Sequence, residues 1–88
     1  MKPFLFSLFL LSNTLYPVLS QSNLLETVKK NPNEARNFCN KFREFNSKGI
    51  SASSDKAIEY VSSKNKLTPV NAEIFSIYVI ALHCPDII

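Results

Sequence analysis

Two cysteines, Cys39 and Cys84, limit what this chain can fold into, because they are the only two among its 88 residues. In an exported chain, two cysteines permit a single intramolecular pairing. A bridge between them closes a loop of about 45 residues, and the chain-entropy model gives such a loop about 4 kcal/mol of stabilisation. We therefore predict a small domain held by a Cys39–Cys84 disulfide. Free buried thiols, or a bond between two chains, are the alternatives.

The first 20 residues have the three-part pattern of a secretory signal peptide. Lys2 supplies the positive start, Phe4 to Leu11 is an apolar run, and Val18-Leu19-Ser20 offers a small-residue cleavage site. The apolar run is shorter than the roughly 20 residues that a membrane-spanning helix needs. We predict that residues 1–20 are a signal peptide and that residues 21–88 form a secreted or periplasmic domain. A retained membrane anchor or a buried first helix is the alternative for the apolar run.

The size and charge of residues 21–88 restrict the class of protein. These 68 residues are enough for one domain with a marginal core. They hold nine of the ten Lys and Arg residues and all seven Asp and Glu residues, so their net charge is about +2. Nucleic-acid binding usually needs a strongly basic patch, and we expect no nucleic-acid partner. Lys41, Arg43 and Lys48 form a weak basic cluster, because Glu44 lies among them.

The sequence contains no motif that predicts catalysis or metal binding. His83 is the only histidine, and no acidic partner or nucleophile is marked for it. We therefore interpret His83 as a solvated or helix-capping side chain rather than a general base. A metal site that recruits His83 and both cysteines, with Asp86 nearby, does not complete a four-ligand structural zinc site. We predict no enzyme activity, no metal and no cofactor.

Capping residues, prolines and the single glycine divide residues 21–88 into helices. The first helix runs from about Ser22-Asn23 to Lys30. Pro32 opens the second helix, with Asn31 as the predicted N-cap in a pattern like a capping box. Gly49 stops this helix, because glycine adopts a positive φ without strain.

Two further helices follow Gly49. Ser53 or Ser54 caps the third helix, and its polar end is predicted to fray from Ser62 to Lys66. Thr68 caps the fourth helix and Pro69 opens it, and the pair Cys84-Pro85 ends it. The predicted fold is all-α, a small bundle of three to four short helices stapled by one disulfide.

The periodicity of the two longer helices predicts which sides are buried. In the second helix, one arc of about 120° holds the apolar residues, namely Ala35, Phe38, Cys39, Phe42 and Phe45. In the fourth helix, apolar residues cover about 200°, and only Glu73, Ser76 and His83 mark a wet strip. We therefore expect the fourth helix to be buried on most sides. Tyr60 falls off the apolar face of the third helix, and either a partner contact or a loop contact suits it.

Short motifs along the chain resemble a known family. They are Cys39, Gly49-Ile50-Ser51, Ala57-Ile58, Leu67-Thr68-Pro69, Ala72-Glu73 and His83-Cys84-Pro85-Asp86. Together they resemble the mycobacterial DUF732-like family of small exported bacterial proteins, similar to short proteins of cyanobacteria. The resemblance covers about Asn33 to Asp86, although the stretch between Cys39 and Gly49 is longer here than in the family. It implies a small helical exported domain with one disulfide, and it brings no known activity and no catalytic residues.

Two classes of function fit these observations. The first is a non-enzymatic interaction or structural module, with an exposed apolar patch around Tyr60, Ile80, Ile87 and Ile88. The second is a carrier of a small apolar ligand or lipid, with a cavity lined by the phenylalanines and the fourth helix. A membrane-active toxin needs a basic amphipathic surface, and the net charge of about +2 argues against it. The expected partner is an unknown protein or an apolar ligand, with no stable membrane span once the signal is removed.

Overall fold

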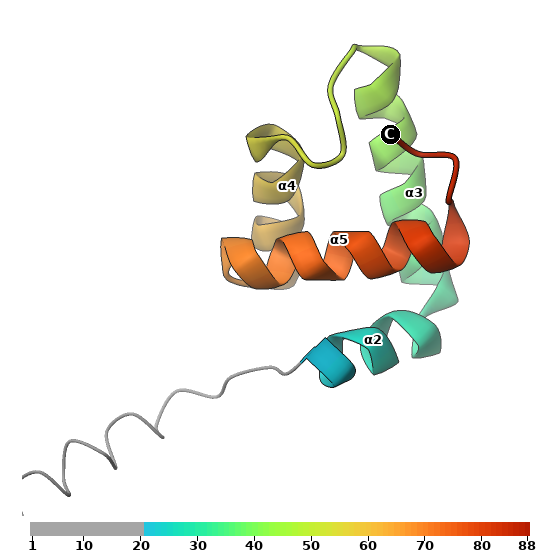
Figure 1. The fold of residues 1–88 in the computed structure, drawn as a ribbon, viewed down its shortest axis with the longest axis vertical. Helices are drawn as coiled ribbons and strands as arrows, with labels where there is room; N and C mark the ends of the chain where they lie inside the picture. The colour runs from blue at the N-terminus through green and yellow to red at the C-terminus, as the bar shows by residue number, and fades with distance from the viewer. Residues whose placement is uncertain (1–20) are drawn as a thin grey trace, which may run out of the picture.

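The computed structural model describes residues 21–88, which form four helices and, within this range, no strand (Figure 1). α2 spans Gln21–Lys30, α3 spans Pro32–Ser47, α4 spans Asp55–Asn65 and α5 spans Pro69–His83. The predicted all-α fold is confirmed. The predicted signal peptide lies outside the described residues, and it stays a prediction.

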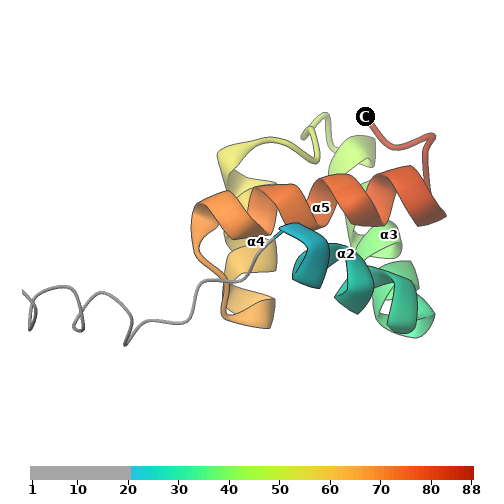
Figure 2. The ribbon, with the colours of Figure 1, turned by 60° about the horizontal axis from the view of Figure 1, so that its bottom comes forward.

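α5 is the helix around which the other three are arranged. It contacts α2, α3 and α4, and its contacts with α4 and α2 are the most extensive between described helices. Figure 1 shows α5 running across α3 and α4, and Figure 2 shows α2 beside α5. α3 and α4 contact each other much less than either contacts α5. The shared core therefore lies on one side of α5.

Asn31 stands at the N-cap position of α3, as predicted, but its side chain does not make the predicted capping bond. Pro32 occupies the first turn of α3 as predicted, whereas the Asn31 side chain makes no capping hydrogen bond to α3. Its Nδ2 donates instead to the Thr27 carbonyl in the last turn of α2, at 2.7 Å. The capping-box prediction is therefore wrong. The amide satisfies an otherwise open carbonyl of the preceding helix, and the proline, which has no N–H, lowers the number of donors that α3 leaves open.

The end of α3 is formed by Gly49, as the sequence predicts. Gly49 has a φ of +77°. The Ile50 N–H donates to the Phe45 carbonyl and the Gly49 N–H donates to the Asn46 carbonyl, each over 2.9 Å. This pair of bonds is the Schellman arrangement, which places a residue in the left-handed region. Glycine takes that conformation without a steric penalty.

α4 begins at the predicted serine but ends later than predicted. Ser54 Oγ accepts a hydrogen bond from the Ala57 N–H at 3.2 Å. The helix continues past Ser62 to Asn65, and its C-cap Lys66 has a φ of 54°, so the predicted fraying is wrong. The Ser62 hydroxyl donates to the Leu67 carbonyl, and the Leu67 N–H donates to the Ser62 carbonyl. These two bonds satisfy polar groups that would face water in a frayed helix end, and they hold the turn between α4 and α5.

The start of α5 is as predicted, but the face that it buries is not. Thr68 Oγ1 accepts a hydrogen bond from the Asn71 N–H at 3.2 Å. Ser76, which the sequence placed on the wet strip, is only 3% exposed. Its hydroxyl donates to the Ala72 carbonyl at 2.9 Å, so its polar group is satisfied inside the helix. The buried residues of α5 are Ala72, Phe75, Ser76 and Val79.

The prediction that α5 is buried on most sides is wrong. Val70, Ile77 and Leu82 are 66%, 56% and 48% exposed. The reason is geometric, because the other three described helices pack against one side of α5 and leave the opposite side bare (Figures 1 and 2). An apolar sequence pattern gives the hydrophobic faces of a helix, but the number of neighbouring helices decides how many of them are covered.

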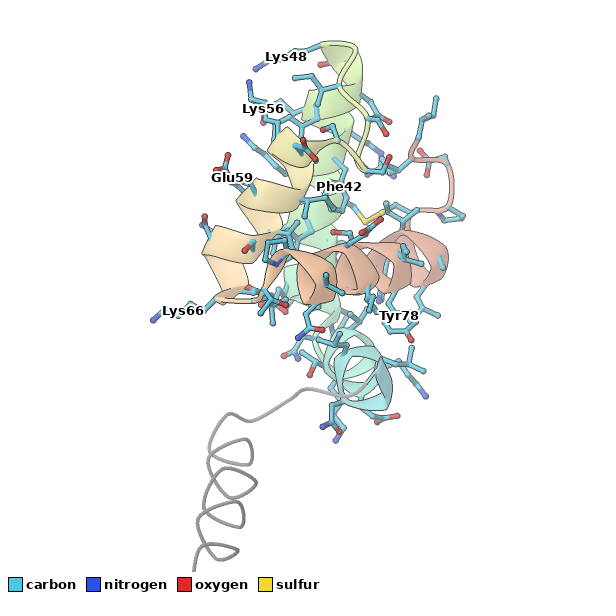
Figure 3. All side chains as sticks on the ribbon, turned by 60° about the vertical axis from the view of Figure 1, so that its left-hand side comes forward. Phe42, Lys48, Lys56, Glu59, Lys66 and Tyr78 are labelled. Carbon is cyan, nitrogen blue, oxygen red and sulfur yellow. A yellow bond between two sulfur atoms is a disulfide. The ribbon has the colours of Figure 1, made fainter. Side chains whose placement is uncertain are left out.

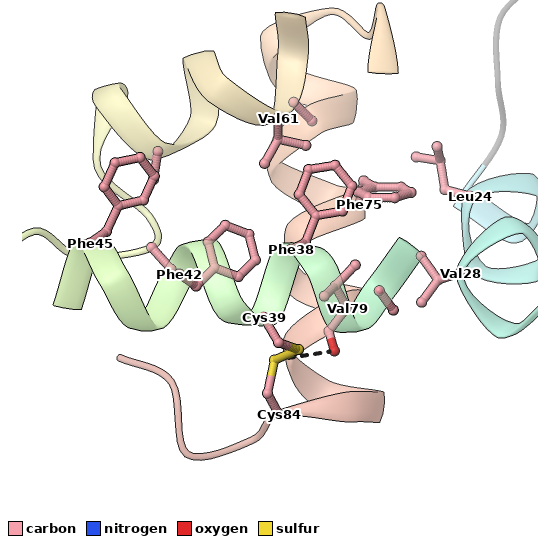
Figure 4. Close-up of a cluster of buried hydrophobic side chains, with 14 residues drawn as sticks. Leu24, Val28, Phe38, Cys39, Phe42, Phe45, Val61, Phe75, Val79 and Cys84 are labelled. Atoms are coloured by element: carbon pink, nitrogen blue, oxygen red, sulfur yellow. Dashed lines mark hydrogen bonds between the residues drawn. A yellow bond between two sulfur atoms is a disulfide. The ribbon is translucent and has the colours of Figure 1, made fainter. Parts of the chain in front are cut away.

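The core is built around the phenylalanines of α3 (Figure 4). All five residues predicted for the inner side of α3 are buried, and Phe42 has no exposed surface. Phe38 contacts Phe75 of α5 edge-on, with ring centroids 5.5 Å apart. Tyr60 of α4 contacts Phe38 and Phe45 edge-on, at 6.0 and 6.1 Å. Tyr60 is therefore a half-buried core contact between α4 and α3, and this answers the question that its sequence position left open.

A disulfide joins Cys39 in α3 to Cys84 at the end of α5 (Figures 3 and 4). The predicted pairing is confirmed, and the two Cα atoms are 6.1 Å apart. Both cysteines are buried, with 2% and 1% of their surface exposed. The bond fastens the C-terminal end of α5 to the middle of α3. It therefore adds a covalent link to a helix pair whose packing is less extensive than that of α4 with α5.

Candidate functional site

The residues that could support chemistry are dispersed. Both cysteine sulfurs are consumed by the disulfide, so the alternative metal site around His83 loses its thiolate ligands. Within residues 21–88, no three His, Cys, Asp or Glu side chains are grouped so that they could hold a metal ion. His83 is half-buried, and its Nε2 is buried with no hydrogen-bond partner among the described residues. The interpretation of His83 as a solvated side chain is therefore wrong for this nitrogen.

The weak basic cluster is neutralised by neighbouring acids. Lys41 Nζ and Lys48 Nζ lie 3.3 and 3.5 Å from the carboxylate of Glu44, and Arg43 lies 3.3 Å from Asp86. The hydrogen bond from Lys41, together with the charges of both lysines, holds the pKa of Glu44 below its ordinary value. Lys41 Nζ also lies 5.1 Å from the ring centres of Phe45 and Tyr60. Three cations against two carboxylates leave one net positive charge, which is a weak attraction for an acidic partner.

The apolar patch predicted around Tyr60 and the last residues is not assembled. Ile80 and Ile87 are half-buried against the core, and so is Tyr60. Ile88 is 83% exposed, although its backbone is hydrogen-bonded to Asn46. The predicted members therefore do not form one exposed surface.

A different apolar surface covers the side of α5 that faces away from the core. At 100° per residue, four apolar side chains fall within about 60° of the helix circumference, opposite the buried face. They are Val70, Ile74, Ile77 and Ala81, and we call them the outer face of α5. Val70 and Ile77 are more than half exposed, Ala81 is exposed and Ile74 is half-buried.

The sequence contains a further signal for the outer face of α5 in the spacing of its residues. Its four positions follow one another at intervals of four, three and four residues, which is the spacing of a coiled-coil seam. Our prediction assigned these residues to the core because they are apolar. The spacing shows instead that α5 carries two separate apolar sides, and the structure provides a partner within residues 21–88 for one of them.

A small apolar hollow lies beside the outer face. It has a volume of about 130 Å³, and Ile58, Ile77, Ile80 and Ile88 are among its lining residues. Its size suits a single apolar side chain of a partner. The hollow therefore extends the outer face of α5 toward the start of α4.

Larger clefts lie on other sides and are more polar than the predicted carrier cavity. A cleft of about 400 Å³ between α3 and α4 is lined by Glu34, Asn37, Phe38, Tyr60, Lys64 and Asn65. A neighbouring cleft of about 350 Å³ reaches Leu24, Leu67 and Phe75. Only one of the phenylalanines of α3 lines either cleft, because the others are packed into the core. None of the four described helices combines the length and hydropathy that crossing a membrane requires.

Comparison with known proteins identifies a family for this chain. The sequence model of a family described as "Domain of unknown function (DUF8664)" matches residues 25–84. No curated protein and no solved structure matches the chain. The matched range begins in α2 and ends at Cys84, so it contains both cysteines of the disulfide and all of α3, α4 and α5. This match confirms the expectation of a domain without a known function. It does not confirm the resemblance to the DUF732-like family. The chain belongs to the DUF8664 family.

Proposed function

We propose that this chain is a small exported module that acts by docking on a protein partner through the outer face of α5, without catalysis. The observation that carries the proposal is the exposure of Val70 and Ile77, at 66% and 56%. Burying a side chain of this size contributes about 1.5–3 kcal/mol. About 60% of each of these two side chains remains to be buried, so covering both would contribute about 2–4 kcal/mol to association. A contiguous apolar surface of this kind on a small domain usually marks an interaction site.

Three observations support the export part of the proposal. The disulfide belongs to a compartment in which such bonds form and persist. Residues 1–20 have the signal-peptide pattern. The motifs around Cys39 and Cys84 also resemble those of exported mycobacterial DUF732-like proteins. The proposed location is the periplasm or the outside of the cell.

The docking proposal is tested in the cell that makes the protein. The full chain is expressed there with a tag and crosslinked, and crosslinked partners are identified for three forms. The natural chain and Asn40→Glu, a matched change at an exposed position of α3, are expected to retain the same partner. Ile77→Glu is expected to lose it, because the partner would bury an unpaired charge. Equal crosslinking of all three forms would exclude the outer face as the docking site.

A second function, the carriage of an apolar ligand, is supported by the cleft of about 350 Å³ that reaches Leu24, Leu67 and Phe75. Its volume is within the range of small-molecule sites. Native mass spectrometry of protein taken from its host is the test. A co-purifying lipid that is lost in Leu67→Arg and kept in Ile77→Glu would support a carrier, and protein without any bound ligand would count against it.

A further inference from the structure

We infer that the partner of the outer face of α5 is a second copy of this chain, with the two α5 helices packed antiparallel. This inference rests on the proposed docking function and names its occupant. It is carried by the arrangement of the four residues along the helix and by the scarcity of charge on α5.

The spacing of the outer face makes it complementary to itself. The four positions are placed symmetrically about the point between Phe75 and Ser76. When two copies run antiparallel about this point, Val70 of one copy lies opposite Ala81 of the other, and Ile74 lies opposite Ile77. Two apolar pairs of similar size fill the centre, and a larger residue meets a smaller one at each end. A twofold interface requires such a surface, because a residue i of one copy that contacts residue j of the other is matched by residue j of the first copy contacting residue i of the second.

The charge of α5 favours an apolar partner over a charged one. Glu73 is the only acidic residue in α5, and the helix contains no Lys or Arg. The face therefore has no basic residues to attract an acidic protein or an anionic lipid surface. Two copies brought together bring only two carboxylates, both at the exposed edge of the seam.

The area of the face sets the strength of the association. Fifteen helical residues extend over about 22 Å, and a helix with its side chains is about 10 Å wide. Such a strip covers about 220 Å² on each copy, so two helices in contact bury on the order of 450 Å² in total, below the roughly 1,200–2,000 Å² of stable complexes. The dimer should therefore be weak and reversible, forming at high local concentration. The apolar hollow beside Ile77 adds to the surface available for contact.

Self-association is measured on the exported, oxidised protein by sedimentation equilibrium from about 1 µM to about 1 mM, the range in which weak dimers dissociate. The natural protein is expected to shift from monomer to dimer with concentration. Ile77→Glu should weaken the association by at least about 100-fold, because each copy would bury an unpaired charge. Asn40→Glu should dimerise like the natural protein. Circular dichroism and thermal unfolding of Ile77→Glu check that the variant still folds, since this side chain is exposed in the monomer.

The antiparallel register has its own test. Val70→Cys and Ala81→Cys proteins are mixed in equal amounts and oxidised with the native disulfide intact. Antiparallel packing predicts a mixed disulfide between the two variants as the main product. Disulfides that join two copies of the same variant would show parallel packing and overturn the proposed arrangement. A monomer at every concentration would overturn the dimer itself.

Carbene footprinting distinguishes failure of the dimer from failure of the docking proposal. The label is applied to purified protein and to protein in the envelope of its host. If the purified protein is monomeric and the outer face is protected only in the envelope, another protein is the partner and the dimer is rejected. If the face is labelled in both samples as fully as in the dilute monomer, the dimer and the docking function are both rejected.

Discussion

The side-chain amide of Asn46 makes two hydrogen bonds with the backbone of Ile88, 42 residues further along the chain. The Ile88 N–H donates to Asn46 Oδ1 at 3.0 Å, and Asn46 Nδ2 donates to the Ile88 carbonyl at 3.2 Å. Asn46 Nδ2 also donates to the Ile50 carbonyl at 2.9 Å, and the Ala52 N–H donates to the Ile88 carbonyl at 2.8 Å. A single polar side chain therefore ties the end of α3, the α3–α4 connection and the last described residue together.

Replacing Asn46 with alanine should lower the free energy of unfolding by about 1 kcal/mol, because the part-buried Ile50 carbonyl and the two exposed backbone groups of Ile88 lose a partner. Hydrogen exchange should become faster at the amides of Ile88 and Ala52. Asn40→Ala is the matched control, since Asn40 is an exposed asparagine of the same helix. Equal stability of the two variants would show that these bonds do not contribute.

Removing the disulfide should cost more. The double variant Cys39→Ser with Cys84→Ser leaves no lone thiol, and its free energy of unfolding in urea should fall by about 2–5 kcal/mol. The natural protein should also resist mild reductants until it unfolds, because both cysteines are almost completely buried. An unchanged urea midpoint in the double variant would contradict the stabilising role of the bond.

Substitutions at Ser76 and Ile77 of α5 test whether the burial seen in the structure or the burial predicted from the sequence is correct. Ser76→Lys should unfold the protein more easily by about 3 kcal/mol or more, because it places a charge in the core. Ile77→Lys should change the stability of the monomer by only about 0.5 kcal/mol, because Ile77 is exposed. Thermal unfolding at low protein concentration measures both. The sequence-based prediction places Ser76 in solvent and Ile77 in the core, so it expects Ile77→Lys to be the more destabilising change. That result would contradict the structure.

The ion pairs of Glu44 give a prediction for pH. The hydrogen bond from Lys41 and the charges of Lys41 and Lys48 lower the pKa of Glu44. A lowered pKa in the folded state stabilises the protein above the unfolded pKa, and this contribution is lost as the pH falls through the folded value. The contribution is small because the group is solvent-exposed. NMR titration should show the pKa of Glu44 rising in Lys41→Met and in high salt, and no rise in either case would exclude the pairing.

The ends of most helices could be predicted from single residues, because each of those residues acts on its own neighbours. Ser54 and Thr68 cap the helices that follow them, and Gly49 takes the positive φ that only glycine adopts without strain. The side-chain bond of Asn31 was predicted wrongly, although its N-cap position was not, because the amide can act in two directions. Its Nδ2 can donate to a carbonyl of the preceding helix, or its Oδ1 can accept from an N–H of the following helix, and the sequence does not show which bond forms.

The candidate site was harder to predict because it depends on tertiary arrangement. The inner side of α3 was predicted correctly, since its apolar residues fall on a single arc. α5 has apolar residues on two sides, and periodicity alone cannot tell which side meets the core. Ser76 is buried and Ile77 is exposed because three helices gather on one side of α5. The spacing of the apolar residues from Val70 to Ala81 was present in the sequence, but only the fold shows that these side chains are exposed.

The position of the disulfide decides how the molecule would respond to proteolysis. The α3–α4 connection, which begins with the exposed Lys48, lies inside the ring closed by Cys39 and Cys84. A cut after Lys48 would give two polypeptides that remain joined through sulfur, so the nicked molecule would keep all its residues until it met a reductant. α2 lies outside the ring and has no such protection, because a single cut near Pro32 would release it. In a protease-rich exterior, the segment most easily lost would therefore be α2 rather than the exposed turn.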